Sequence, residues 1–331
     1  MERFRLENNN GVEVEFLSLG GRIYSVKVPN NSGKLDVALG CGELPGDAFM
    51  GAFCGRFANR IKNGTFILDG EVVELPKNEY PNHVHGGNQG FNTKFWEVTS
   101  VSLEGYVSAF RLKLFSPDGE EGYPGNLETE LIYALNDNNE LLIDIKAKTD
   151  KPTIVNLTSH PYFNLNGVDS GLVLNHKLQI FADHYAPTDE RGVPTGEIAE
   201  VEGTDLDFLE PHLLINIEKS NFPQIVMKGG LDNTWVIKGK DKSLVKACVL
   251  SEPKSGRAIE LYTTQPALQV YTGNHFDGSQ KEKCGIPLKK YSGVALEAQN
   301  IPDAPNKPHF PNAVLRENEI FHEQIVYRFI F

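Results

Sequence analysis

The sequence predicts an all-β protein, built as a large antiparallel β-sandwich with very little helix. Short segments of alternating apolar and polar residues recur along the 331 residues, and this period of two is typical of half-buried strands. Helical periodicity over ten or more residues is hard to find, and residues 205–211 form at most a turn or two. No change of composition and no repeat divides the chain. We therefore expect a single domain over residues 1–331, with two sheets packed face to face.

Two hairpins are the clearest local signals. Residues 65–68 and 71–75 flank the pair Asp69-Gly70, which suits a type I′ turn. Residues 127–135 and 140–147 flank four residues that include three asparagines, and these strands form the second hairpin. The remaining expected strands are residues 12–19, 22–28, 243–250, 257–263, 268–272, 293–298 and 323–331.

Composition excludes several classes of function. The net charge of −12 repels phosphate backbones, so we expect no nucleic-acid partner. The first seven residues carry charges and lack the apolar core of a signal peptide, and no apolar run reaches the length of a membrane span. The four cysteines form no CxxC pair, which favours buried thiols in a reducing compartment. We expect a soluble, cytoplasmic protein without a membrane partner.

The segment NLTSHPYFNL at residues 156–165 contains the first candidate for chemistry. Pro161 biases His160 towards an extended backbone and away from a helix. A histidine held at the end of a strand and flanked by aromatic residues can serve as a positioned proton donor. The alternative is a buried histidine satisfied by a neighbouring carbonyl, so the other motifs must decide between the two.

Two polar islands precede this segment. Asn59 and Arg60 place an amide beside a guanidinium, and the guanidinium can donate in a fork to vicinal oxygens. His83 and His85 would face the same side of a strand, a spacing that could bind zinc. A zinc site needs three or four ligands, and no nearby Cys, His or Asp completes the set, so we expect no metal ion.

Three polar islands follow it. Asp232 comes after two glycines, Gln269 projects from an expected strand, and Glu297 lies inside an otherwise apolar strand. A glutamate is expensive to bury unless it is paired, so Glu297 is either outward-facing or functional. Together with histidine and arginine, these side chains suit general acid–base chemistry on a polyhydroxylated substrate. No nucleophile and no cofactor motif stands out, so we expect no cofactor.

Eight segments occur in an order that resembles one known family, aldose 1-epimerase, also called galactose mutarotase. The resemblance extends from residue 55 to residue 306 and so covers essentially the whole chain. It implies a sandwich of the galactose-mutarotase type that interconverts the α and β anomers of free hexoses such as galactose and glucose, with the small sugar as the partner. The sequence leaves the oligomeric state open, and we expect a monomer. The segments are GRFANRI, HVHGG, EEGYPGNL, NLTSHPYFNL, PTGEIAEVEGTDLDF, GGLDNTW, TTQPALQVYTGN and LEAQNIPDAPN.

The resemblance also implies roles for individual residues. His160 matches the family's catalytic acid, which protonates the ring oxygen of the sugar. Glu297 matches its catalytic base, which takes the proton from the O1 hydroxyl. His83 matches no site residue of the family. The positions that hold the sugar hydroxyls are matched by Asn59, Arg60, His85, Asp232 and Gln269.

Three alternatives stay open at this point. A hexose-6-phosphate 1-epimerase on the same fold would need cations at the phosphate, for which Arg56 and Lys62 are available. A non-catalytic sugar-binding sandwich would not require an acid–base pair. A metal-dependent sandwich enzyme would use His83 and His85 as ligands.

Overall fold

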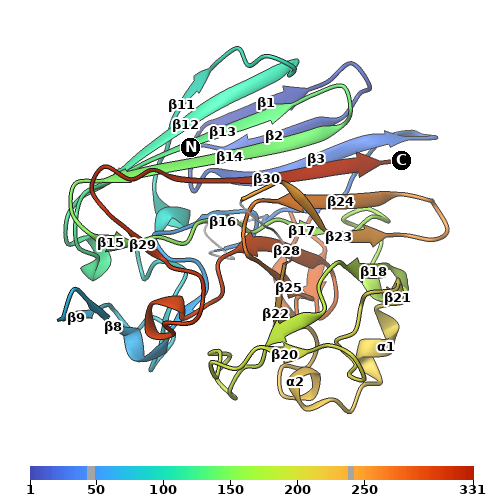
Figure 1. Ribbon diagram of the computed structural model, residues 1–331. Helices are drawn as coiled ribbons and strands as arrows, with labels where there is room; N and C mark the ends of the chain where they lie inside the picture. Colours follow the sequence, from blue (N-terminus) through green and yellow to red (C-terminus); the bar gives the residue numbers. More distant parts are fainter. Residues whose placement is uncertain (43–48, 238–241) are drawn as a thin grey trace.

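Two large sheets face each other across the main hydrophobic core, as the sequence predicts (Figure 1). The computed structural model describes residues 1–42, 49–237 and 242–331. In this part of the chain, all paired strands run antiparallel. The sheets contact each other directly: the rings of Phe163 and Tyr327 lie 5.4 Å apart, and the Tyr327 hydroxyl donates to the Leu296 carbonyl.

The larger sheet has nine strands and is completed by the last strand of the chain. Its first four strands form a meander, and β30 then pairs with β14 on one side and β24 on the other. The two halves of this sheet therefore join only when the C-terminus is in place. Across the sheet, the strands are β11 Glu97–Ser100, β12 Ser108–Ser116, β13 Leu127–Leu135, β14 Glu140–Thr149, β30 Phe321–Ile330, β24 Ala258–Thr263, β23 Val245–Ser251, β18 Lys177–Ile180 and β21 His212–Leu213.

The second sheet has seven strands and carries three of the predicted site residues, Asp232, Gln269 and Glu297. All six residues of its strand β28 are buried, because the strand has neighbours on both sides and is covered on both faces. Such a strand is expected to be an almost continuous apolar run. Across the sheet, the strands are β20 Ala199–Glu200, β19 His184–Ala186, β22 Asp232–Val236, β25 Ala267–Tyr271, β28 Val294–Gln299, β17 Tyr162–Phe163 and β5 Ala38–Leu39.

The connections form short two-stranded ladders and brief helical turns. No helix in the described ranges is long and apolar enough to cross a membrane. The ladders pair β6 Phe53–Cys54 with β16 Thr158–Ser159, β7 Arg60–Ile61 with β10 His83–Val84, β8 Thr65–Leu68 with β9 Glu71–Glu74, β15 Thr153–Ile154 with β29 Val314–Leu315, and β26 Asp277–Lys281 with β27 Pro287–Lys289. The helices are α1 Ile215–Glu218, α2 Pro223–Val226 and the 3₁₀ turns Lys62–Gly64, Phe91–Thr93, Glu120–Gly122, Val173–Asn175 and Ala304–Asn306.

Both predicted hairpins are confirmed. Asp69 and Gly70 have φ angles of 50° and 89°, the positive values that a type I′ turn needs at both central residues. The second hairpin joins β13 to β14 through residues 136–139, with Leu135 opposite Leu141. Local turn chemistry was sufficient in both cases, because the strands that meet are neighbours in the sequence.

No helix forms at residues 205–211, in agreement with the expectation of at most a turn or two, and the short helices α1 and α2 come later. Side chains in this segment take the backbone hydrogen bonds that a helix would use. The Leu206 amide donates to Thr204 Oγ1, and the Leu209 amide donates to Asp207 Oδ1. Threonine and aspartate compete with helices in this way. The Leu206 carbonyl accepts instead from the Trp235 indole, which anchors the segment on the seven-stranded sheet.

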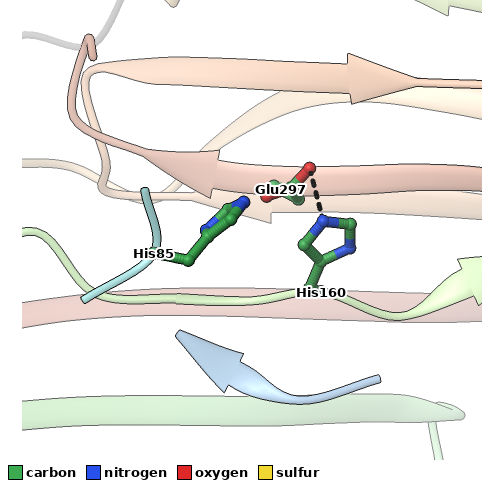
Figure 2. A group of neighbouring side chains, drawn as sticks. All are labelled: His85, His160 and Glu297. Atoms are coloured by element: carbon green, nitrogen blue, oxygen red, sulfur yellow. Dashed lines mark ion pairs between the residues drawn. The ribbon is translucent and has the colours of Figure 1, made fainter. Parts of the chain in front are cut away.

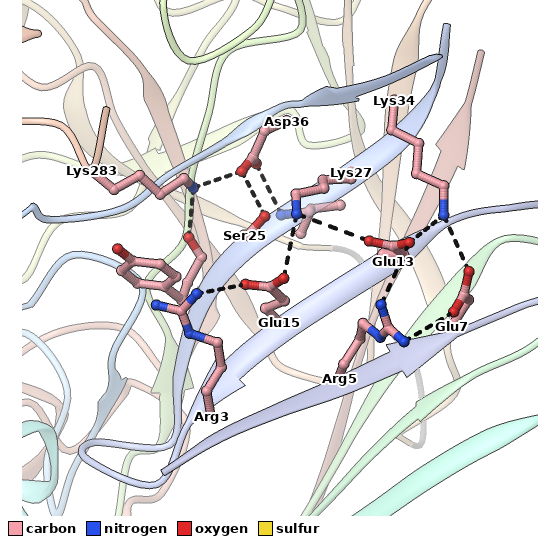
Figure 3. A network of polar contacts seen from close by, with 12 residues as sticks. Arg3, Arg5, Glu7, Glu13, Glu15, Ser25, Lys27, Lys34, Asp36 and Lys283 are labelled. Atoms are coloured by element: carbon pink, nitrogen blue, oxygen red, sulfur yellow. Dashed lines mark hydrogen bonds and ion pairs between the residues drawn. The ribbon is translucent and has the colours of Figure 1, made fainter. Parts of the chain in front are cut away.

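The N-terminal residues form a separate four-stranded sheet, which the sequence analysis placed within the sandwich. Its outer face carries a network of ion pairs across the strands (Figure 3), in which Lys27 Nζ lies 3.3 Å from Glu15 Oε1 and Lys34 contacts Glu13. The Lys34 hydrogen bond and the nearby cations lower the pKa of Glu13, against the opposing effect of its partial burial. The strands are β1 Arg3–Glu7, β2 Glu13–Leu17, β3 Arg22–Asn30 and β4 Gly33–Asp36.

Lys283 attaches the β26–β27 hairpin to this N-terminal sheet (Figure 3). Its ammonium group lies 2.9 Å from Asp36 Oδ2 and donates to the carbonyl oxygens of Tyr24 and Ala38, both at 2.7 Å. The side chain is only 12% exposed, so these contacts are made largely away from water. The hairpin also carries Cys284, which is exposed although we expected every cysteine to be buried.

Substitution of Lys283 by Met should destabilise the protein by about 1–3 kcal/mol, because it removes the ion-pair partner of Asp36 and a largely buried donor to two carbonyl groups. Lys151→Met is the matched control, since Lys151 is 56% exposed and pairs with Asp118 at the surface. Urea unfolding of the two variants should show a lowered midpoint for the first and an unchanged midpoint for the second. Equal midpoints would show that Lys283 is no more important than a surface lysine.

Candidate active site

A polar pocket of about 250 Å³ opens beside the seven-stranded sheet. Its walls combine titratable side chains with aromatic rings, the composition expected of a small-molecule site. They come from strands β22, β25 and β28, from the short strands β7, β10, β17 and β26, and from loops between strands. The lining residues are Phe49, Asn59, Arg60, Glu79, Val84, His85, His160, Tyr162, Asp232, Tyr271, His275, Phe276, Gln280 and Glu297.

Glu297 projects into this pocket from the buried strand β28. Its side chain is 2% exposed, and its Oε2 atom has no hydrogen-bond partner among the described residues. Burial raises the pKa of Glu297 well above the usual range, and the nearby Asp232 raises it further while Arg60 opposes the shift. A carboxyl group with a raised pKa in a pocket is typical of an acid–base residue. Glu297 is therefore not outward-facing, which excludes one of the two alternatives that the sequence left open.

His160 is held opposite Glu297 by its backbone. It lies between the short strands β16 and β17, where its amide donates to the Ala52 carbonyl and its own carbonyl accepts from the Gly51 amide. The imidazole stacks on the Tyr162 ring at 4.9 Å, with an angle of 24° between the planes. These contacts place Nε2 of His160 3.4 Å from Oε1 of Glu297 (Figure 2).

Asn59 and His85 fix each other's orientation. Both have left-handed backbones, with φ angles of 62° and 49°. The backbone N–H of His85 donates to the backbone carbonyl of Asn59, and the backbone N–H of Asn59 donates in return to Nδ1 of His85. Burial, followed by the charges of His160 and Arg60, lowers the pKa of His85 well below its usual value. The neutral ring accepts at Nδ1, so its proton is on Nε2, which makes His85 a hydrogen-bond donor in the pocket.

This tautomer argues against a metal site. His85, His160 and Glu297 each offer one possible ligand atom, and these three atoms lie within 4.8 Å of one another. No other such cluster of three occurs within the described ranges. To ligate a metal through Nε2, His85 would need its proton on Nδ1, where it would oppose the Asn59 amide. A ligating histidine usually donates its second N–H to an acceptor. At Nδ1 of His85 the chain instead offers a donor, the backbone N–H of Asn59.

His83 and His85 do not face the same side, as they would if both lay on one strand. Strand β10 ends at Val84, and the left-handed backbone of His85 turns the two rings apart. Nε2 of His83 lies 2.6 Å from the Tyr123 hydroxyl, and Nδ1 lies 2.7 Å from the Pro76 carbonyl. Burial lowers the pKa of His83 to about 4, although the Pro76 contact opposes the shift. His83 is a buried structural residue outside the pocket.

Arg60 lines the pocket but does not present the free fork that the sequence suggested. Its Nε and Nη2 atoms donate to the two carboxylate oxygens of Glu79, at 2.5 and 2.9 Å. Its Nη1 atom lies 3.9 Å from Oδ2 of Asp232. Burial acts to lower the pKa of Arg60, but Asp232 and Glu79 outweigh it, and the pKa is raised. One edge of the guanidinium is therefore taken, and the other faces the pocket.

Gln269 lies behind Asp232 and is not among the residues that line the pocket. Its amide nitrogen donates to Oδ1 of Asp232 at 2.6 Å, and its amide oxygen accepts from the Thr234 hydroxyl. Thr234, Gln269 and Glu297 are opposite one another on β22, β25 and β28, so their side chains share one face of the sheet. This row aligns the Asp232 carboxylate with the site.

The sequence analysis missed the aromatic wall and the rim of the pocket. Tyr162 and Tyr271 each come two residues after a residue that it did select, His160 and Gln269. Because side chains two apart on a strand share a face, the period of two was a usable signal for these tyrosines. Glu79 and His275 had no such signal, since they lie in turns, and Gln280 lies on β26, which is not part of this sheet. The missed residues are Phe49, Glu79, Val84, Tyr162, Tyr271, His275, Phe276 and Gln280.

Comparison with known proteins decides the family. The family model described as aldose 1-epimerase matches residues 2–328. The chain is 40% identical to galactose mutarotase from Bos taurus, over 99% of this chain and 94% of that protein, and 38% identical to aldose 1-epimerase from Escherichia coli K12, over 98% and 94%. The chain belongs to the aldose 1-epimerase family. Among solved structures, galactose 1-epimerase from Lactobacillus acidophilus NCFM superimposes with a TM-score of 0.86 at 31% identity, over 98% of this chain and 93% of that chain.

This aldose 1-epimerase is an isomerase with the galactose-mutarotase fold. Its site does not use the cations that the phosphorylated-sugar alternative invoked. Arg56 is 2% exposed, and its guanidinium donates to carbonyl groups of the chain and to the Ser116 hydroxyl. Lys62 lies outside the pocket lining. Arg56 therefore supports the fold and is unavailable to a phosphate group.

Epimerase activity should survive exhaustive dialysis against EDTA, because His85 is set up as a hydrogen-bond donor and not as a ligand. The measurement is polarimetry on a freshly dissolved anomer before and after chelation, with added Zn²⁺ as a third condition. Activity that is lost on chelation and restored by zinc would contradict this assignment of the His85 proton.

Proposed function

We propose that this aldose 1-epimerase interconverts the α and β anomers of free hexoses, galactose and glucose among them, with Glu297 as general base and His160 as general acid. The observation that carries the proposal is the 3.4 Å approach of His160 Nε2 to Glu297 Oε1 in a buried polar pocket. The substrate class is supported by relatives named galactose mutarotase and galactose 1-epimerase.

The reaction begins with two proton transfers at the anomeric carbon. Glu297 takes the proton from the O1 hydroxyl while C1–O1 becomes a carbonyl bond, the C1–O5 bond breaks, and His160 gives its proton to O5. Rotation about C1–C2 then presents the other face of the aldehyde. O5 attacks C1, its proton returns to His160, and O1 regains a proton from Glu297. Both side chains end in their starting protonation states, so the cycle needs no co-reactant.

The geometry of the pair fits this chemistry. O1 and O5 are bonded to the same carbon, so the base and the acid must reach two neighbouring oxygen atoms. Two groups that converge to 3.4 Å can do this without large movements. The raised pKa of Glu297 makes its conjugate acid a weaker acid, and therefore makes the carboxylate a stronger base towards a sugar hydroxyl.

The hydroxyl groups away from C1 would be held by the remaining polar side chains. Arg60 and the Nε2–H of His85 donate, Asp232 accepts, and the Asn59 side chain completes this edge of the pocket. Gln269 acts through Asp232, whose carboxylate it orients. We also keep the expectation of one domain, which is supported by a family match over residues 2–328, and the expectation of a monomer.

Glu297→Gln should reduce kcat by at least about 100-fold, because the amide keeps the size of the side chain but cannot accept the proton. KM should change little, since the sugar is held mainly by other groups. The control is Glu130→Gln, the same chemical change on the nine-stranded sheet away from the pocket. Polarimetric turnover near the wild-type value in the first variant would exclude Glu297 as the base.

The acidic limb of kcat/KM should lie above 4.5, the ordinary pKa of a glutamate. The base must be ionised, so activity falls as the pH drops through the raised pKa of Glu297. Arg60, Asp232, His85 and His160 are the charged or titratable groups around it. Asp232→Asn removes a charge that raises this pKa, so the limb should move to lower pH in that variant. A limb at or below 4.5 in the wild type, or an unmoved limb in Asp232→Asn, would contradict the assignment.

A further inference from the structure

Arg60 lies between two carboxylates that compete for it. Glu79 takes the Nε and Nη2 atoms in a bidentate pair, while Asp232 lies 3.9 Å from Nη1 on the opposite side. A guanidinium has five N–H donors in a planar fork. The Glu79 pair uses one edge of that fork. The edge formed by Nη1 and the second hydrogen of Nη2 is left for the pocket.

From this division we propose that Glu79 is a positioning residue for the epimerase reaction: it holds Arg60 back from Asp232, so that both side chains stay available to sugar hydroxyl groups. The inference rests on the proposed function, because it assumes that Arg60 binds the sugar. Glu79 acts on the substrate through Arg60 and takes no part in proton transfer at C1.

The competing arrangement is a direct Arg60–Asp232 pair. A distance of 3.9 Å is at the outer limit of an ion pair, and small rotations of the long arginine side chain would shorten it. A closed pair would satisfy Asp232 and the inner edge of Arg60 with each other, which removes an acceptor and donors from the sugar. Glu79 opposes that collapse with two charge-assisted hydrogen bonds, the strongest class available to a guanidinium.

The surroundings of Glu79 are built to hold its side chain in place. Its backbone forms a tight turn in which the Glu79 amide donates to the Asn82 carbonyl and the Asn82 amide donates to the Glu79 carbonyl. The Asn78 side chain fastens this turn to Val84 through two hydrogen bonds of 2.9 Å. Val84 is also the direct partner of Arg60 in the β7–β10 ladder. The carboxylate and the guanidinium are thus attached to the same short ladder.

Gly192 also packs closely against the guanidinium of Arg60. A Cβ atom at this position would lie 2.9 Å from Nη1 of Arg60, so the backbone of the 187–195 loop passes directly over the guanidinium. Arg60 is 14% exposed and Glu79 is 42% exposed. A partly exposed pair of this kind adds little to overall stability. Its effect is on the orientation of Arg60. Orientation matters because a misplacement of about 1 Å in a substrate-positioning group can reduce the rate of catalysis strongly.

The experiment compares Glu79→Gln, Arg60→Ala and the double variant by steady-state polarimetry. Glu79→Gln keeps the size of the side chain but loses one of the two acceptor oxygens. We expect KM to rise about three- to tenfold, the range of a weakened hydrogen bond to a charged group, with kcat within about twofold of wild type. Because Glu79 acts only through Arg60, the double variant should have the KM of Arg60→Ala alone. Glu79→Asp, which keeps the carboxylate, should lie between Glu79→Gln and wild type.

Asp69→Asn is the matched control. Asp69 makes a bidentate pair with Arg316, at 3.0 and 2.7 Å, on the exposed β8–β9 hairpin outside the pocket. Its loss should leave both KM and kcat unchanged. Wild-type KM in Glu79→Gln, a fall in kcat alone, or additive effects in the double variant would overturn the inference. Wild-type KM in Arg60→Ala would instead show that Arg60 does not bind the sugar, which counts against the proposed site itself.

Discussion

The placement of one carboxyl group inside a sheet determines much of this structure. Glu297 occupies a strand whose six residues are all buried, where an isolated carboxylate would be strongly disfavoured. The protein does not remove this cost with a close arginine or lysine. It surrounds Glu297 with a histidine at 3.4 Å, a second carboxylate and a more distant guanidinium. The result is a base with a raised pKa at the end of a pocket, in a position that a substrate can reach.

The groups around Glu297 are oriented by contacts with the backbone and with neighbouring strands. The Asn59 amide decides which nitrogen of His85 carries the proton, and the Gly51–Ala52 backbone holds His160 at both of its peptide groups. Gln269 and Thr234 lie in register with Glu297 and direct the Asp232 carboxylate. Each polar group in the pocket therefore has a defined role as donor or acceptor before a sugar arrives, which lowers the cost of reorganisation during the reaction.

Glycine has a specific part in bringing the two halves of the pocket together. Gly86 follows His85 with a φ of 88°, and a Cβ atom there would lie 1.8 Å from the Gly55 carbonyl. Only glycine permits this approach, since a side chain would collide with backbone atoms that cannot move aside. The approach brings the loop of His85 against the segment that leads into Asn59 and Arg60. The reciprocal hydrogen bonds of Asn59 and His85 depend on it.

The sequence by itself determined the β class, both hairpins and, through its resemblance to a family, six of the residues that line the pocket. These features depend on local turn chemistry, on a period of two or on short motifs, all of which can be read along the chain. The tertiary structure alone decided that His83 pairs with Tyr123, that Arg56 is structural, and that Glu79 occupies one edge of Arg60. Those outcomes depend on which buried donors and acceptors remain unpaired after distant segments meet. That balance of partners exists only once β30 has completed the larger sheet and the two sheets have closed on each other.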